Sequence, residues 1–204
     1  MKKFELIIGL IAILGIVLKL FHIPGSGVLT VLTLSTLSMF YYVFSFALFN
    51  DIRLRDIFKK ASYKDTNAKR IIGAIGLGFA LSTITIGGLF KLQFWPGATV
   101  QLMAGLVMTG LILLIAAIYY FRSKADYYTR VLKRIAIYSG LGLILYLTPT
   151  ATIVDIYYVG NTDYAELYKK VLADPENIQL REQLEKMREE MLEKELQDEL
   201  EKNR

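Results

Sequence analysis

The 204-residue sequence contains no cysteine, one histidine and one tryptophan, and it has only four prolines. Without cysteine the chain can form neither a disulfide nor a thiolate metal site, and it has no cysteine nucleophile. Its single histidine and the scarcity of carboxylates in its apolar segments leave little material for hydrolytic or redox catalysis. We therefore expect no enzymatic activity, no cofactor and no metal site.

Acidic residues are scarce over most of the chain. Residues 1–161 carry 16 Lys and Arg against 6 Asp and Glu, whereas residues 162–204 carry 8 against 13. The positive charges stand beside long apolar segments, where such charges orient membrane helices. The formal charge of +5 therefore reflects membrane orientation, and we expect no nucleic-acid partner.

Long apolar blocks dominate the sequence, which is 54% hydrophobic with a mean hydropathy of +0.40. A bilayer core needs roughly 20 apolar residues per helix, and several blocks reach this length. None alternates apolar and polar residues as a membrane strand does. We predict an all-α integral membrane protein with about five transmembrane helices in residues 1–160. The blocks occupy residues 4–21, 28–49, 71–90, 98–121 and, more weakly, 135–154.

Two of these blocks allow a second interpretation. The first follows a basic N-terminus, as in a signal peptide, but no small-residue cleavage site follows it, so we expect a retained helix. The fifth contains Pro149, and proline removes a helical donor and clashes with the preceding turn. This block is either a short span that ends before Pro149 or a kinked span that reaches Val154.

Basic residues are concentrated in two of the connections between blocks. Residues 51–70 contain seven Lys and Arg and residues 122–134 contain five, whereas residues 22–27 and 91–97 contain only Lys91. By the positive-inside rule the basic connections lie in the cytoplasm. We therefore expect a multi-pass protein of a bacterial inner membrane with a cytoplasmic N-terminus. The C-terminal tail is then periplasmic, or cytoplasmic if the fifth block does not span.

The first four blocks form an internal repeat with a shift of 72 residues. GIVLKLFHIPGSGV at residues 15–28 aligns with GGLFKLQFWPGATV at residues 87–100, with six identities. Each unit holds two spans, so both copies enter and leave on the same side of the membrane. We predict two parallel-repeat hairpins, repeat one in residues 4–49 and repeat two in residues 71–121, unlike the inverted repeats of many transporters.

The turn of each hairpin supplies the candidate functional residues. The two lysines either anchor the hairpins at the membrane interface or face the bundle interior, where a cation costs several kcal/mol and needs a partner. Glu5, the only carboxylate in the first four blocks, lies at the opposite end of its helix. The histidine is either a polar helix-end residue or a titrating group beside the first lysine. The candidates are Lys19, His22 and Lys91 as polar groups, and Pro24, Gly25, Pro96 and Gly97 as turn residues.

Residues 161–204 read as an acidic, amphipathic, soluble helical tail. Residues 174–176, Asp-Pro-Glu, have the composition of a helix start. A narrow apolar stripe follows, which fits either a solvated helix or a docking site for a partner protein or a second copy. The stripe consists of Leu180, Leu184, Met187 and Met191.

Glycines recur within the apolar blocks, as in membrane helices that pack closely against one another. They are Gly73, Gly76, Gly78, Gly87, Gly88, Gly105 and Gly110.

The repeated hairpin resembles the membrane hairpin of GldL, the inner-membrane ring subunit of the proton-driven motor for type IX secretion and gliding motility. The similarity is carried by LKLFH at residues 18–22 and FKLQFWPG at residues 90–97. It extends over residues 9–49 and 81–121, in two copies where the family has one. The resemblance implies a related hairpin architecture and a bacterial envelope setting.

The departures from the family bear on its motor activity. The returning helix of GldL carries an intramembrane glutamate that is central to proton coupling, whereas residues 34–45 and 106–117 contain no acid. The second copy also has Phe94 where the first has His22. We therefore expect a non-catalytic structural or interaction subunit, embedded in the lipid bilayer, that binds a protein partner or itself through its membrane helices and tail. The alternative is a small transporter or channel for an anion or polar solute, lined by Lys19, Lys91 and the hydroxyl-rich residues 30–38.

Overall fold

The computed structural model describes residues 1–202, without the side chains of residues 195, 196, 198, 199, 201 and 202. The last two residues of the predicted tail, 203 and 204, lie outside the described part. The chain divides into two compact units, one of residues 1–148 and one that begins at Pro149. Over the described residues the regular structure is helical throughout, which agrees with the predicted all-α class.

Helices α1 to α4 overlap the first four predicted blocks, whereas α5 begins nine residues before the fifth block and ends seven residues before that block ends. Each hairpin consists of two long antiparallel helices joined by a short turn, and a 3₁₀-rich connection links the hairpins. The first unit contains α1 Lys2–Leu20, α2 Ser26–Phe49, the 3₁₀ turns η1 Leu54–Asp56 and η2 Lys60–Tyr63, α3 Ala68–Leu92, α4 Ala98–Ser123 and α5 Asp126–Leu147. The second contains α6 Thr150–Tyr157, α7 Thr162–Ala173 and α8 Ile178–Lys202.

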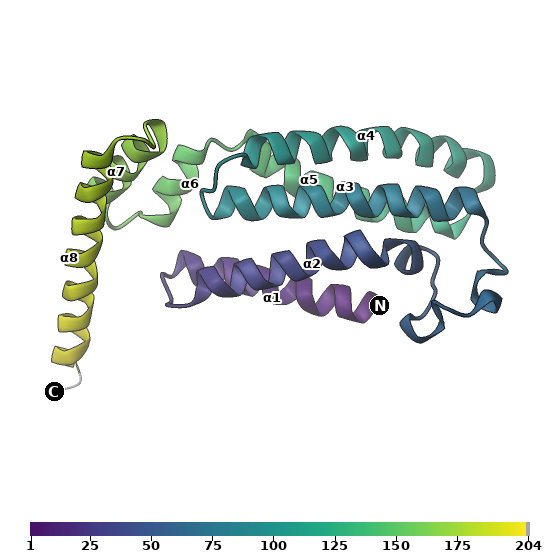
Figure 1. Ribbon diagram of the computed structural model, residues 1–204, viewed down its shortest axis with the longest axis horizontal. Helices are drawn as coiled ribbons and strands as arrows, with labels where there is room; N and C mark the ends of the chain where they lie inside the picture. Colours follow the sequence, from purple (N-terminus) through teal and green to yellow (C-terminus); the bar gives the residue numbers. More distant parts are fainter. Residues whose placement is uncertain (203–204) are drawn as a thin grey trace. The chain divides into compact units, whose positions relative to one another are not determined.

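Helix α3 is the central element of the first unit. It packs against α2, α4 and α5, while α1 packs against α2, and Figure 1 shows α2, α3 and α4 side by side. Helices α1, α3 and α5 run in one direction, and α2 and α4 return. One end of the bundle, called here the basic end, carries the N-terminus and the basic loop, residues 51–67. The other, the turn end, carries the two hairpin turns.

Three helices, α2, α3 and α4, are long and apolar enough to cross a membrane. Helix α1 is 19 residues long, with Lys2, Lys3 and Glu5 at one end and Lys19 at the other. The fifth block is divided at Pro149 into α5 and α6, and these two could supply one more span only as a single broken one. The helices thus fit a helical membrane protein, and the predicted number of five spans stays a prediction.

Glycines let α3 approach its neighbours closely. A methyl group at Gly78 would overlap the Ser45 side chain on α2, and one at Gly87 would lie 2.8 Å from the Leu102 backbone nitrogen on α4. A methyl group at Gly105 on α4 would lie 2.5 Å from the Ile84 side chain on α3. These glycines allow close helix packing, as predicted. A methyl group at the predicted Gly88 would lie 3.3 Å from the Leu145 side chain on α5, a tight contact. Gly73, Gly76 and Gly110 have more room, with the nearest atoms at 3.9 and 4.0 Å for the first two and none within 4 Å for Gly110.

The second unit corrects the predicted start of the tail helix. Asp174 does not begin a helix; its backbone N–H donates to the Lys170 carbonyl at 3.0 Å and closes α7. Helix α8 begins four residues later, where the Asn177 side chain accepts from the Leu180 N–H at 3.2 Å. Both residue types cap helices well, and the asparagine takes the role because α7 extends to Ala173.

The α2–α3 contact yields a test of the packing. The methyl group that Gly78→Ala adds would overlap the Ser45 side chain and lie 2.6 Å from the Tyr41 carbonyl oxygen. Overpacking of this kind lowers the free energy of unfolding by about 1–3 kcal/mol. We expect a lower midpoint of thermal unfolding in detergent, followed by circular dichroism. Gly110→Ala is the matched control, because that methyl meets nothing within 4 Å. Equal midpoints for the two variants would refute the close contact.

Candidate functional site

The two hairpin turns have the same backbone conformation at equivalent positions. His22 and Phe94 have positive φ angles of 56° and 57°, and Gly25 and Gly97 have 82° and 85°. Glycine reaches this left-handed region at little cost because it lacks a Cβ atom. Both glycines are the residue before the returning helix. The predicted turn glycines are therefore explained by backbone geometry.

The outward helices end in the same way in both hairpins. The Ile23 N–H donates to the Leu18 carbonyl at 3.1 Å, and the Trp95 N–H donates to the Phe90 carbonyl at 2.8 Å. A bond of this span across a left-handed residue is the Schellman arrangement, which satisfies the last carbonyls of a helix. A proline follows directly in each turn, Pro24 and Pro96, where it prevents the helix from continuing.

Lys19 connects the first hairpin to the second. Its ammonium group donates to the Leu92 carbonyl at 2.6 Å and to the Gln93 side-chain oxygen at 3.0 Å. The Gln93 amide in turn donates to the Gly27 carbonyl on α2 at 3.2 Å. The ammonium group therefore lies at the C-terminus of α3, where the helix dipole is negative.

Lys91 occupies the equivalent position in the second hairpin but a different environment. Its side chain is 4% exposed, and among the described residues its ammonium group makes no hydrogen bond or ion pair. Four residues earlier, Gly87 packs directly against α4, so Lys91 extends along the same face of α3. The two lysines that the repeat pairs are thus not equivalent in the structure.

His22 holds the left-handed position at the end of α1 and is exposed. Histidine is enriched among the non-glycine residues that adopt this conformation. The backbone conformation therefore gives a structural reason for a histidine at this position.

A second polar cluster, which the sequence did not predict, lies at the basic end. The Arg134 guanidinium on α5 donates two hydrogen bonds to the Glu5 carboxylate on α1, at 2.8 and 2.6 Å. The Tyr41 hydroxyl on α2 donates to the same carboxylate at 2.6 Å. Glu5 is 9% exposed and Tyr41 is fully buried. Three helices therefore meet at one buried, bidentate ion pair.

A second ion pair lies one helical turn toward the end of the bundle. Asp51, directly after α2, contacts the Lys2 ammonium group on α1 and the Arg130 guanidinium on α5, the latter at 2.8 Å. Arg130 and Arg134 are four residues apart and share one face of α5. The two layers together form an ion-pair ladder between α1, the end of α2 and α5.

Aromatic rings surround the inner layer of this ladder. The Tyr41 and Tyr138 rings meet edge to face at 5.2 Å, and the Arg134 guanidinium lies 5.2 Å from the centre of the Phe49 ring. The rings cover much of the ion pair, and Phe49 adds a cation–π attraction. The pair is therefore held in a fixed geometry.

Sequence reasoning missed the ladder because hydropathy assigned residues 122–134 to a loop. In the structure α5 already begins at Asp126. Tyr127, Val131 and Ile135 are all buried, and their spacing of four was the signal that this basic stretch is helical. Once it is helical, Arg130 and Arg134 become candidate partners for acids at the start of the chain.

The described residues offer ion pairs and hydrogen bonds but no metal site. Among them no three His, Asp or Glu side chains lie together as a metal ion would require. The basic-end cluster is closed, because the Glu5 oxygens are occupied by Arg134 and Tyr41. Its arrangement suits a structural clamp between helices.

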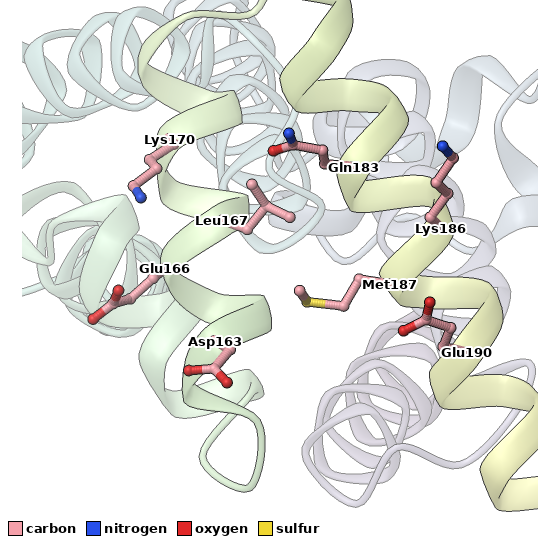
Figure 2. Close-up of a pocket in the computed structure, with 8 residues that line it drawn as sticks. All are labelled: Asp163, Glu166, Leu167, Lys170, Gln183, Lys186, Met187 and Glu190. Carbon is pink, nitrogen blue, oxygen red and sulfur yellow. The ribbon is translucent and has the colours of Figure 1, made fainter.

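The second unit has its own core and a groove. The Tyr158, Tyr164 and Tyr168 rings pack with centres 4.7–6.0 Å apart, and burial raises the pKa of Tyr168 to about 12. Figure 2 shows a groove between α7 and α8, in which Leu167 and Met187 point toward each other between charged side chains. Part of the predicted apolar stripe of the tail therefore faces α7.

Comparison with known proteins gives one family match. The model of the GldL N-terminal domain matches residues 74–136, which are α3 from its second turn, α4 and the first half of α5. The resemblance to GldL inferred from the sequence is thereby confirmed. The matched family is not a known enzyme family. No curated protein and no solved structure matches the chain.

The basic-end cluster yields a test by substitution. Glu5→Gln leaves the Arg134 guanidinium buried without its counter-charge, which costs about 3–5 kcal/mol. We expect a marked fall in the thermal unfolding midpoint in detergent, and a partial recovery when Arg134→Met is added. Lys59→Gln is the control, because it removes an ion pair with Asp56 at the surface, where such pairs contribute little to stability. If Glu5→Gln were no more destabilising than Lys59→Gln, the ion pair would not be a clamp.

Proposed function

We propose that the protein is a non-catalytic structural or interaction subunit of the bacterial cell envelope, built on GldL-like hairpins and not itself a proton-driven motor. The similarity of residues 74–136 to the GldL N-terminal domain carries this proposal, since GldL-like proteins are membrane components of gliding and type IX secretion complexes. The turn geometry shared by the two hairpins supports a duplication of that unit.

The placement of carboxylates in the helices speaks against a proton-driven motor. The returning helices α2 and α4 contain no Asp or Glu in their sequences, whereas a GldL-like motor needs an acid there. The acid that the bundle does bury, Glu5, is engaged by Arg134 and Tyr41. Both Glu5 oxygens accept hydrogen bonds from these partners, so the carboxylate serves to hold helices together.

The contacts of the polar residues favour a structural role over transport. Lys19, which an anion pathway would need, donates to the end of α3. The hydroxyls of Thr30, Thr33 and Thr36 donate to carbonyls of their own helix at 2.8, 2.7 and 2.7 Å. Hydroxyls bonded in this way do not offer their protons to a passing solute.

The proposed setting is the inner membrane, with the basic end in the cytoplasm. The basic loop contributes exposed Lys and Arg at that end, in agreement with the positive-inside rule. If α5 and α6 complete a fifth span, the acidic tail lies in the periplasm.

Cysteine labelling tests this orientation. Because the chain lacks cysteine, a single cysteine can be placed in the loop or in the tail and labelled from either side of the membrane. We expect a cysteine in the loop to be protected from a reagent that cannot cross the inner membrane, and its labelling from the periplasmic side would contradict the proposed orientation.

The tail is the proposed docking element. Ile178 and Leu192 on α8 are exposed apolar side chains within an acidic helix, and such residues suit a partner with complementary apolar and basic groups.

Co-purification from cross-linked membranes tests this role. We expect full-length protein to retain a partner protein that a chain truncated after Gly160 loses, because the truncation removes α7 and α8. Leu192→Glu serves as a finer variant that keeps the helix and removes one exposed apolar contact. A truncated chain that keeps every partner of the full-length protein would contradict the docking role of the tail.

A further inference from the structure

The basic loop, residues 51–67, is folded by its own hydrogen bonds. The Tyr63 hydroxyl donates to the Ile57 carbonyl at 2.7 Å, and the Thr66 hydroxyl donates to the Asn50 side chain at 2.7 Å. Two 3₁₀ turns, η1 and η2, shape the chain between these bonds. The loop therefore presents its outward side chains in a defined arrangement.

Two large apolar side chains point outward from this folded loop. Phe58 is 99% exposed and Leu54 is 57% exposed. Together these two side chains form an exposed apolar surface on one folded loop. Such a surface indicates an apolar contact outside the chain.

The loop that carries these two side chains is rich in exposed cations. Asp56 is the nearest acid in the sequence, and it is already engaged by Lys59 at 2.8 Å and contacted by Arg55 at 3.7 Å, so it does not offset the remaining positive charge. The exposed cations of the loop are Arg53, Arg55, Lys59, Lys60 and Lys64.

The position of the loop limits what can contact it. It joins α2 and α3, both long and apolar enough to span a membrane, and Leu54 is five residues from the end of α2 at Phe49. Five residues reach at most about 18 Å, so Leu54 stays near the membrane surface. Aromatic and aliphatic groups among Lys and Arg are typical of segments at an anionic lipid interface.

We propose that the basic loop binds the surface of an anionic phospholipid bilayer, with Phe58 and Leu54 inserted at the level of the headgroups and the exposed cations of the loop on the lipid phosphates. This inference rests on the proposed membrane-spanning role of the bundle.

Tryptophan fluorescence in reconstituted vesicles tests the proposal. The chain has a single tryptophan, Trp95, at the turn end, so Phe58→Trp combined with Trp95→Phe moves the reporter to the loop. In vesicles of phosphatidylglycerol and phosphatidylcholine we expect blue-shifted emission and strong quenching by lipids brominated near the headgroup. In phosphatidylcholine alone we expect at least twofold weaker quenching. Adding Arg55→Gln, Lys60→Gln and Lys64→Gln should reduce the quenching in anionic vesicles to the phosphatidylcholine level.

Two controls make the outcome decisive. Leu192→Trp with Trp95→Phe places a reporter on α8 and should remain unquenched. The unmodified Trp95 reports insertion of the bundle itself. If Trp95 is quenched but the Phe58→Trp reporter emits as in water, the loop does not bind lipid and the proposal is overturned. The apolar side chains of the loop would then be assigned to contact with a protein partner. If neither reporter is quenched, the chain does not insert and the proposed function fails with it.

Discussion

The ion pair between Glu5 and Arg134 is the constraint on which the first unit depends. It joins the first and the fifth helix of the chain, 129 residues apart in sequence. Removing two charges from water is costly, and the cost is recovered only when every oxygen and N–H of the pair has a partner. The Tyr41 hydroxyl supplies one such partner, and the outer layer at Asp51 holds the same helices together one turn away.

The opposite end of the bundle uses a different device for the same purpose. There Lys19 donates to the Leu92 carbonyl at the end of α3 and to the Gln93 side chain, so the first hairpin is attached to the second by a charge on a helix terminus. Between the two ends, α2 and α3 approach closely at Gly78 and Ser45. A hairpin that belongs to a motor in a related family is here fixed by polar contacts at both ends and by close packing between them.

Hydrophobic length and the Pro-Gly signals act locally, so the sequence indicates the four hairpin helices and the turns between them, but hydropathy assigned the start of α5 to a loop. Helices α1 to α4 overlap the predicted blocks, and Gly25 and Gly97 stand directly before the returning helices. The partners of Glu5 and Lys19 could not be predicted, since they come from α5 and α3 and depend on which helices become neighbours. The start of α8 was predicted wrongly because Asp174 and Asn177 both carry capping side chains, and the length of α7 decides between them.

Proton uptake by liposomes containing the purified protein and a pH-sensitive dye tests the central claim, that this GldL-like bundle is a structural element and not a proton path. Under an imposed membrane potential the account predicts uptake equal to that of protein-free liposomes, because Glu5 is engaged by Arg134 and no acid lies in α2 or α4. Uptake that exceeds the protein-free rate and rises with the amount of folded protein would contradict it.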